Sequence, residues 1–145
     1  MTGSEQLEIE AACYRLVTDY CHFVDHGEAS RIADLFTEDG VWRSPEQTMS
    51  GKDELRAGFQ AREDNKGRMS RHVCNNFRLF EIGENQAKGR VYLTLYRHDG
   101  EPGRAFSPLN GPAVVGEYED EFVRTEDGWR IKHRAIKVDF VRSRE

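Results

Sequence analysis

Residues 113–124 read AVVGEYEDEFVR and residues 129–140 read WRIKHRAIKVDF, and the two runs are joined by TEDG at 125–128. Both runs alternate between polar and apolar or aromatic side chains, which is the two-residue period of a β-strand. The turn at Glu126–Asp127–Gly128 between them predicts an antiparallel hairpin. Residues 70–82 and 88–98 alternate in the same way on either side of Gly83–Glu84–Asn85. We therefore expect four successive antiparallel strands in the C-terminal half.

The N-terminal half follows a helical period instead. Between residues 4 and 25, apolar side chains recur at steps of three and four: Leu7, Ala11, Tyr14, Val17, Cys21 and Val24. This pattern predicts a first helix that starts at Ser4 and stops at His26–Gly27. A short helix at 28–36, a brief strand at 41–44 and a third helix opened by Ser50 should follow. Helices followed by antiparallel strands indicate an α+β fold, and we expect residues 1–145 to form one domain.

Composition narrows the classes of function. The 145 residues are 37% hydrophobic and 32% charged, with a net charge of −5 and three cysteines. The acidic balance disfavours nucleic-acid binding, which needs a basic face. The sequence has no apolar run long enough for a membrane span and does not start like a secretion signal, so we expect a cytoplasmic protein. The three cysteines are not spaced as in a zinc finger. For His22 and His26 we predict a solvated or capping role and no metal site.

Residues 99–112 interrupt the run of strands. Gly100, Pro102, Gly103, Pro108, Gly111 and Pro112 exclude regular structure there. A loop of this length in a small domain is often a lid or a binding loop. An idle surface loop is an equally good interpretation.

Asp25 and His72 are the first candidates for chemistry. Asp25 falls at the C-terminal end of the first helix, where the helix dipole disfavours a carboxylate. That carboxylate is either solvated or held by a cation or a hydrogen-bond donor. His72 opens an alternating strand and is the candidate partner, because imidazole is well suited to moving protons near neutral pH. A histidine on a strand is more often a structural hydrogen-bonding group, so both interpretations stay open.

The strand at 113–124 adds a second candidate group. Its even positions include Tyr118, Asp120 and Arg124, whereas its odd positions are mostly acidic. If the even face points inward, Asp120 and Arg124 should be paired, because a buried charge needs a partner. The pair would then be either a structural ion pair or part of a catalytic site.

Three tyrosines are further candidates, either to line a polar pocket or to donate a phenolic proton. Tyr92 and Tyr96 share one face of residues 88–98, although a packed sheet face explains them equally well. Tyr20 is a candidate phenolic donor for the neighbourhood of Asp25. Five helical residues separate the two by about 140°, so they converge only if the helix bends or frays.

Four motifs occur in this order along the chain: Tyr20-x4-Asp25, Leu35-Phe36-x2-Asp39-x2-Trp42, Arg71-His72-x3-Asn76, and Gly116-x-Tyr118-x-Asp120-x-Phe122 with Gly128-Trp129. Together with the order of elements they resemble the SnoaL-like branch of the NTF2-like superfamily. The resemblance covers the whole chain and points to the group of scytalone dehydratase, bile acid 7α-dehydratase and lindane dehydrochlorinase. It implies a cone, in which a strongly curved mixed or antiparallel sheet wraps around three N-terminal helices and a pocket opens at the wide end.

The resemblance also implies roles for individual residues. In these relatives an Asp at the end of the first helix and a His on the following long strand form a proton-transfer dyad, and Asp25 and His72 match those positions. Tyr20 matches an acid, and Arg124 matches an arginine that assists the leaving group. Scytalone dehydratase has a second histidine where this chain has Gly116, so scytalone is not the expected substrate.

The function implied is that of a cofactor-free lyase or isomerase, dehydratase-like, acting on a small, cyclic, largely apolar substrate as a homodimer. The expected pocket residues are Trp42, Asn76, Tyr92, Tyr96, Tyr118 and Asp120. The superfamily has non-catalytic members, so the alternative is a binding module or a dioxygenase-type small subunit. Such a subunit should expose an apolar sheet face, whereas the sequence predicts an acidic one at Glu117, Glu119 and Glu121.

Overall fold

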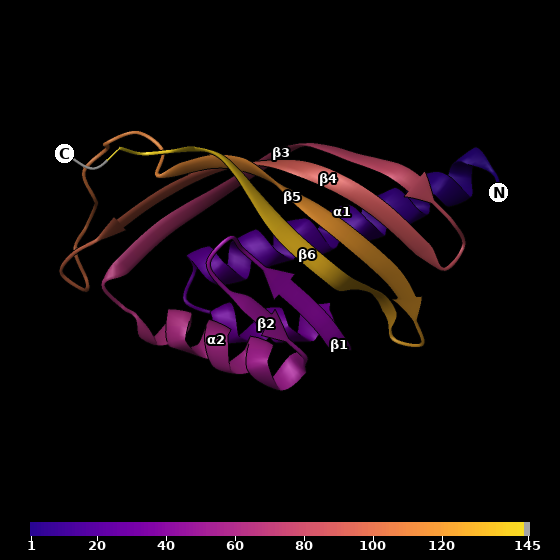
Figure 1. Ribbon diagram of the computed structural model, residues 1–145, viewed down its shortest axis with the longest axis horizontal. Helices are drawn as coiled ribbons and strands as arrows, with labels where there is room; N and C mark the ends of the chain where they lie inside the picture. The colour runs from indigo at the N-terminus through magenta and orange to yellow at the C-terminus, as the bar shows by residue number, and fades with distance from the viewer. Residues whose placement is uncertain (144–145) are drawn as a thin grey trace.

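The computed structural model describes residues 1–143, with helices in the first half and long strands in the second. Helix α1 (Gly3–Asp25) and the 3-10 helix η1 (Ala29–Leu35) come first, followed by strands β1 (Phe36–Arg43) and β2 (Thr48–Ser50) and then by helix α2 (Lys52–Asp64). Four long strands follow: β3 (Arg68–Ile82), β4 (Gln86–Asp99), β5 (Val114–Thr125) and β6 (Gly128–Val141) (Figure 1). The α+β order and both predicted hairpins are confirmed.

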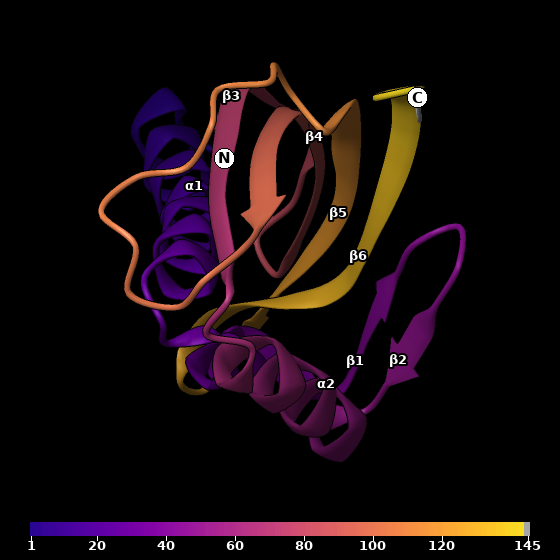
Figure 2. The same cartoon turned by 90° about the vertical axis from the view of Figure 1, so that its left-hand side faces the viewer.

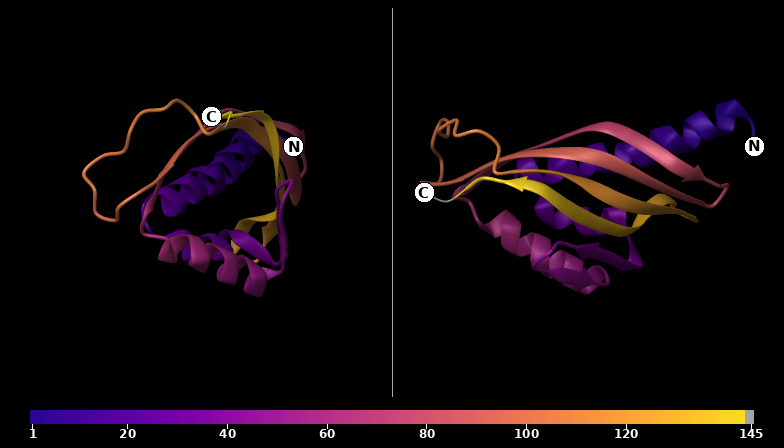
Figure 3. Two further views of the ribbon diagram at one scale, coloured as in Figure 1. Left: turned by 60° about the vertical axis from the view of Figure 1, so that its left-hand side comes forward. Right: turned by 45° about the horizontal axis from the view of Figure 1, so that its top comes forward.

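All six strands form one mixed sheet in the order β2-β1-β6-β5-β4-β3. Strand β1 runs parallel to β6, and the other neighbours are antiparallel. Seen from the end where residues 99–112 lie, β3 to β6 form a bent wall with α1 along one side and α2 below (Figure 2). The sheet therefore curves around the helices, as expected (Figure 3).

Helix α1 supplies the aspartate of the site. Thr2, rather than Ser4, caps its N-terminus, because the Thr2 hydroxyl accepts a hydrogen bond from the Glu5 amide at 3.1 Å. The helix ends at Asp25, shortly before Gly27 with its positive φ of 78°. Within residues 1–143, no helix combines the length and the hydropathy needed to cross a bilayer.

The buried face of α1 is rotated from the predicted stripe. Its buried side chains are Ile9, Cys13, Leu16, Val17, Tyr20 and Val24. By contrast, Leu7 is 67% exposed and Tyr14 is 41% exposed. A period of 3.6 residues fits more than one stripe in this sequence, and packing against the concave side of the sheet selects the one that contains Tyr20. The rotation therefore brings Tyr20 into the interior.

The short helix predicted at 28–36 is confirmed as the 3-10 helix η1, whereas the predicted start of the third helix is corrected. Ser50 ends β2, and Gly51 is the N-cap of α2 without a side-chain hydrogen bond. Gly51 has a φ of 87°, a conformation that favours glycine. The predicted capping box is not formed; instead the Glu54 carboxylate accepts from the amide of Ser50, the residue before the N-cap, at 3.2 Å.

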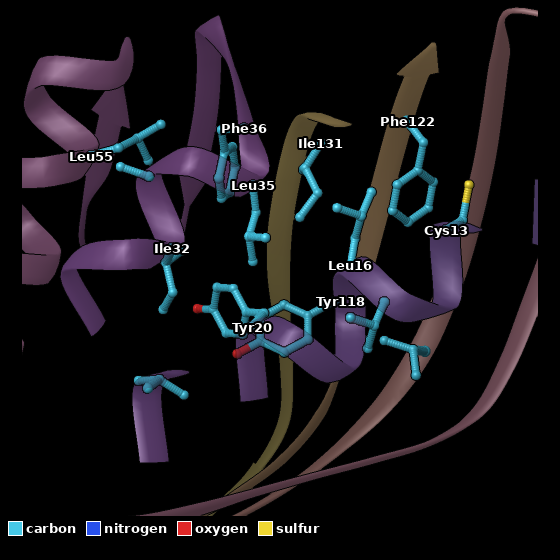
Figure 4. Packing of buried hydrophobic residues seen from close by; sticks show 14 of the residues in the cluster. Cys13, Leu16, Tyr20, Ile32, Leu35, Phe36, Leu55, Tyr118, Phe122 and Ile131 are labelled. Carbon is cyan, nitrogen blue, oxygen red and sulfur yellow. The ribbon is translucent and has the colours of Figure 1, made fainter. Parts of the chain in front are cut away.

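One core joins the inner face of the sheet to α1 and η1. Figure 4 shows Cys13, Leu16 and Tyr20 of α1 facing Tyr118, Phe122 and Ile131 of the sheet. The even positions of β5 point inward, as predicted for residues 116–122. Because this face includes Asp120, the core has to accommodate charge.

Strand β3 changes faces partway along. His72 and Cys74 lie on its inner side, but the pairing with β4 slips just after Asn75, and Asn76 has a positive φ of 57°. This is a β-bulge, in which an extra residue reverses the alternation of the strand. Phe77 is the next side chain against the core, so the bulge turns Asn76, an expected pocket residue, away from the interior.

Candidate active site

The carboxylate of Asp25 accepts three hydrogen bonds from β3. Oδ1 accepts from the Ser70 hydroxyl at 2.8 Å and from His72 Nδ1 at 2.7 Å, and Oδ2 accepts from the His72 backbone amide at 2.8 Å. The side chain is 5% exposed. Burial disfavours the charged carboxylate, but the hydrogen bonds from His72 and Ser70 outweigh it and hold the pKa of Asp25 below its usual range. Asp25 is therefore ionised, and its donors offset the unfavourable helix dipole.

His72 is oriented by this carboxylate. An ionised carboxylate can only accept hydrogen bonds, so Nδ1 of His72 carries the proton. In the neutral imidazole the lone pair of Nε2 is then available, and no side chain or backbone group of residues 1–143 hydrogen-bonds to that nitrogen. The His72 side chain is 11% exposed. An imidazole fixed in this tautomer is arranged to accept a proton through Nε2.

Tyr20 also lies next to the imidazole of His72. The two rings are 6.3 Å apart between centroids and meet edge to face at 79°. The Tyr20 hydroxyl accepts a hydrogen bond from Trp42 Nε1 at 3.1 Å. Burial raises the pKa of Tyr20, and the nearby charge of Arg134 partly opposes this. Helix α1 stays helical to Asp25, so Tyr20 and Asp25 both lie near the same imidazole without fraying of the helix end.

A buried ion pair lies behind Tyr20. Arg134 Nε and Nη2 donate to the two oxygens of Asp120 at 2.7 and 3.0 Å, and both side chains are 0% exposed. The Arg134 guanidinium carbon lies 3.8 Å from the centroid of the Tyr118 ring and 4.4 Å from that of Tyr20. These two rings lie side by side in Figure 4. Burial alone would lower the pKa of Arg134, but Asp120 outweighs it and raises that pKa.

One guanidinium nitrogen of Arg134 has no hydrogen-bond partner among the described residues. This nitrogen, Nη1, is buried. Sequence reasoning did not single out Arg134. The one signal was its place on an alternating strand with Ile131 and Ile136, and an irregularity in the register of β6 obscured that signal.

The predicted partner of Asp120 was Arg124, and the structure places Arg124 elsewhere. Its side chain is exposed near the β5–β6 hairpin, with Nη1 3.5 Å from the Glu84 carbonyl. Across the sheet, His72 is opposite Leu95, and Leu95 is opposite Val114. Arg124 is ten residues further along β5 than Val114, which is about 33 Å at 3.3 Å per residue. Arg124 therefore cannot contact a substrate that also touches His72 unless that substrate spans most of the cone.

The expected pocket residues divide into two groups. Trp42, Tyr118 and Asp120 lie in the interior with Tyr20. Tyr92 and Tyr96 are 51% and 36% exposed on the outer face, because the inner face of β4 carries Val91, Leu93 and Leu95. Asn76 is exposed at the bulge of β3. Alternation identified the two faces of these strands but not which face is buried.

Gly116 is confined by a close approach of backbone. It points inward on β5, and a Cβ there would collide with the backbone carbonyl of Lys137 on the neighbouring strand β6. A side chain of any size requires the two strands to separate. This explains in physical terms why no second histidine stands at this position.

The histidines of the first helix lie outside the site. The rings of His22 and His26 stack 4.6 Å apart, and His26 Nδ1 is 2.9 Å from the His22 carbonyl oxygen at the end of α1. Of the solvated or capping role predicted for these histidines, His26 has the capping one and His22 is largely solvated. In the described part of the chain, no three His, Cys, Asp or Glu side chains are grouped to hold a metal ion.

Residues 100–113, between β4 and β5, form a loop anchored through Arg104. The Arg104 guanidinium donates to the carbonyls of Gly67, His98 and Glu101 at 2.9 to 3.0 Å and to the Ser107 hydroxyl at 2.8 Å. The loop passes in front of α1 and β3 in Figure 2. Phe106 and Leu109 in it are 82% and 84% exposed. The loop is thus tied to the start of β3, close to the dyad.

Two surface grooves lie away from the dyad. One of about 410 Å³ is formed by α1, η1 and the start of β6, and one of about 470 Å³ lies between α1 and the bulge of β3. Neither groove is lined by Asp25 or His72. The dyad is the candidate site because of its hydrogen-bond geometry, and not because of the size of a groove.

Comparison with known proteins agrees with this fold. Residues 5–135 match the SnoaL-like domain family. No protein of curated function matches the sequence. A structure provisionally assigned as a scytalone dehydratase, from Novosphingobium aromaticivorans, is 19% identical with a TM-score of 0.82, over 99% of this chain and 93% of that one.

Two further structures have the same architecture. LinA is 19% identical with a TM-score of 0.77, over 97% of this chain and 92% of its own. An NTF2-like protein with a cystatin-like fold, from Novosphingobium aromaticivorans, is 21% identical with a TM-score of 0.75, over 92% and 83%. At such identities these structures establish the fold, while the match over residues 5–135 establishes the family. The chain belongs to the family of SnoaL-like domains and has the NTF2-like fold.

Proposed function

We propose that this chain is a proton-transfer enzyme, a dehydratase-like lyase or an isomerase, that acts on a small cyclic substrate with a largely apolar body. One observation carries the proposal: Asp25 accepts a 2.7 Å hydrogen bond from His72 Nδ1 and leaves Nε2 free. An oriented imidazole with a free nitrogen is the usual form of a general base. The similarity to a structure provisionally assigned as a scytalone dehydratase supports the lyase class.

In the proposed reaction, Nε2 of His72 takes a proton from a carbon beside a carbonyl group. In an elimination, the C–H electron pair becomes a C=C bond, and a hydroxide or halide leaves the adjacent carbon with its bonding pair. In an isomerisation, the imidazolium returns the proton to a different carbon. Asp25 stabilises the imidazolium, and Tyr20 protonates a departing hydroxide to give water.

Arg134 replaces Arg124 in this proposal. Its charge lies beside the Tyr20 ring and lowers the pKa of that buried phenol relative to burial alone. A more acidic phenol is a better proton donor to a leaving group. Arg134 therefore assists through Tyr20, as a positioning residue held in place by Asp120.

The test is hydrogen exchange, which reports proton transfer even where no elimination follows. A cyclic ketone such as 2-tetralone is incubated with the protein in D₂O, and loss of the α-proton signal is followed by NMR. We expect the wild type to accelerate exchange and the His72→Ala variant to have an exchange rate lower by about 10²–10⁴-fold. His26→Ala is the matched control, because His26 is the exposed neighbour of Asp25 in sequence. Exchange at the buffer rate in the wild type, or a full rate in His72→Ala, contradicts the proposal.

One surface favours a second candidate, a binding module or small subunit. Val73, Tyr92, Tyr96 and Phe140 are 36–70% exposed on the outer face of the sheet. Val73 and Phe140 lie in one row across the strands, through Thr94 and Val115. The acidic outer face predicted from the sequence is partly neutralised, because Glu117 lies 3.2 Å from Arg90 and 3.8 Å from Lys137.

The same face supports the proposed homodimer. Exposed apolar groups gathered on one side of a sheet are typical of an interface. Light scattering on the purified chain should give a dimer mass, and Phe140→Glu should shift it to the monomer. A wild-type chain that is monomeric at micromolar concentration would instead favour a subunit that needs a different partner.

A further inference from the structure

Four arginines gather where β3 begins and β4 ends: Arg62, Arg68, Arg97 and Arg142. Within residues 1–143, only Arg68 has a carboxylate partner within 4 Å, since its Nε and Nη2 donate to Asp99 at 2.8 and 3.0 Å. The chain as a whole carries a net charge of −5. A local excess of positive charge on an acidic protein is a feature that the proposed reaction does not explain.

Arg62 is linked directly to the dyad. From the last turn of α2, its Nη2 donates to the Ser70 hydroxyl at 3.1 Å, and that hydroxyl donates to Asp25. The side chain is partly buried, and in the described chain no carboxylate lies within ion-pair distance. A partly buried guanidinium with no carboxylate in direct contact is incompletely compensated, so an anion bound there gains more than it would at a fully solvated arginine.

Arg97 lies beside Ser70 on the inner face. Ser70 and Arg97 are opposite one another in the β3–β4 ladder, as are His72 and Leu95. Arg97 is therefore the diagonal neighbour of His72 on the same face, about 7–8 Å away. Its guanidinium makes no hydrogen bond to any described residue and is exposed at the open end of the cone.

The electrostatic surroundings of Arg62 and Arg97 also favour a bound anion. Partial loss of solvent and the charge of Arg68 lower the pKa of both Arg62 and Arg97. Asp25 and Asp99 oppose the shift at Arg62, and Asp99 and Glu46 oppose it at Arg97. A bound anion would relieve the repulsion between these cations.

Apolar surface lies on the same inner face. Val138 is opposite Gly116 and is 37% exposed, and Val141 is opposite Val114 and is 71% exposed. Gly116 and Val114 are on the inner side of β5, so their partners on β6 are too. This end of the cone thus offers apolar side chains together with the two arginines that lack carboxylate partners.

We infer that the substrate carries a carboxylate or phosphate group on its apolar body, and that Arg62 and Arg97 bind this anion while His72 faces the reacting carbon. The inference rests on the proposed function and adds the chemical class of the substrate to it. Arg97 and His72 are diagonal neighbours in the sheet, so the anionic group would lie close to the imidazole. The substrate should therefore carry this group on or near the ring that reacts.

Calorimetric titration with three probes on one ring system tests this: 2-naphthoate, 2-naphthyl phosphate and the neutral 2-naphthamide. We expect the wild type to bind one of the two anions at least tenfold more tightly than the amide, and the better anion distinguishes carboxylate from phosphate. Arg97→Gln and Arg62→Gln should each reduce that preference to about threefold or less. Arg78→Gln is the matched control, because Arg78 is an exposed arginine on β3 beyond the bulge.

The inference is overturned if the wild type binds the three probes with equal affinity, or if both arginine variants keep the full preference for the anion.

The His72→Ala variant distinguishes failure of this inference from failure of the proposed function. This variant should keep the preference for the anion, because the imidazole is not a ligand of the anionic group. Loss of hydrogen exchange without loss of anion preference is expected for His72→Ala. Anion preference in a wild type that catalyses no exchange would refute the proton-transfer proposal alone.

Discussion

Replacing Asp120 by Asn should destabilise the protein far more than the loss of an ordinary ion pair does. Asp120 and Arg134 form two hydrogen bonds of 2.7 and 3.0 Å, and neither side chain reaches solvent. The substitution leaves the Arg134 charge in the core without its counter-ion. Removal of one partner from a buried pair costs about 3–5 kcal/mol, whereas exposed pairs are worth about 0–1 kcal/mol.

Urea unfolding followed by circular dichroism measures this cost. At an m-value of about 2 kcal/mol/M, the expected loss lowers the midpoint by about 1.5–2.5 M. Asp34→Asn is the control, because Asp34 pairs with Arg56 at 2.6 Å with both side chains about half exposed. It should change the free energy of unfolding by less than about 1 kcal/mol.

A double variant separates the buried charge from other effects of the substitution. Asp120→Leu with Arg134→Met removes both charges, and apolar replacement of a buried pair is often neutral or stabilising. We expect the double variant to be more stable than Asp120→Asn. A cost below about 1 kcal/mol for Asp120→Asn, or a double variant that is less stable than Asp120→Asn, would refute the reasoning.

Three further results are expected. The pKa of Asp25 is lower in the folded state than in the unfolded chain, so its contribution to stability is present at neutral pH and is lost as the pH falls below about 4; urea unfolding between pH 3 and 7 should show a smaller acid loss in Asp25→Asn. Cys13 is fully buried and its pKa is raised to about 12, so it should resist Ellman's reagent until the protein unfolds; rapid labelling of Cys13 in the native protein, located by mass spectrometry, would be inconsistent with this. At Asn76, with its φ of 57°, Asn76→Val should cost about 1–3 kcal/mol and Asn76→Gly much less; equal costs in urea would argue against the bulge.

Much of the fold could be predicted from the sequence because it rests on local patterns. The two-residue and 3.6-residue periods separate the strands from the helices, and the short turns at Gly83–Glu84–Asn85 and Glu126–Asp127–Gly128 define the hairpins. The pairing of Asp25 with His72 was predicted from the position of a carboxylate at a helix end and from a family resemblance. The 2.7 Å contact agrees with that expectation.

The partner of Asp120 depended on a register that local patterns do not contain. Counting evenly from the β5–β6 turn places residue 120 opposite His133. In the structure Phe122 is opposite Ile131 but Glu121 is opposite His133, so one extra residue enters β6 and Arg134 moves opposite Asp120. A one-residue shift moves every later side chain of a strand to the other face, which is why Arg134 is buried.

Which face of β4 and of α1 is buried also depends on tertiary packing. Alternation in β4 is equally consistent with Tyr92 and Tyr96 inside or outside, and only packing into the common core selects the Val91–Leu95 side. The same packing rotates α1 so that Tyr20 points inward. Sequence by itself therefore determined the order of elements and the two residues of the dyad. Tertiary structure decided which arginine, which tyrosines and which face of each element surround that dyad, because burial depends on contacts between segments far apart in the chain.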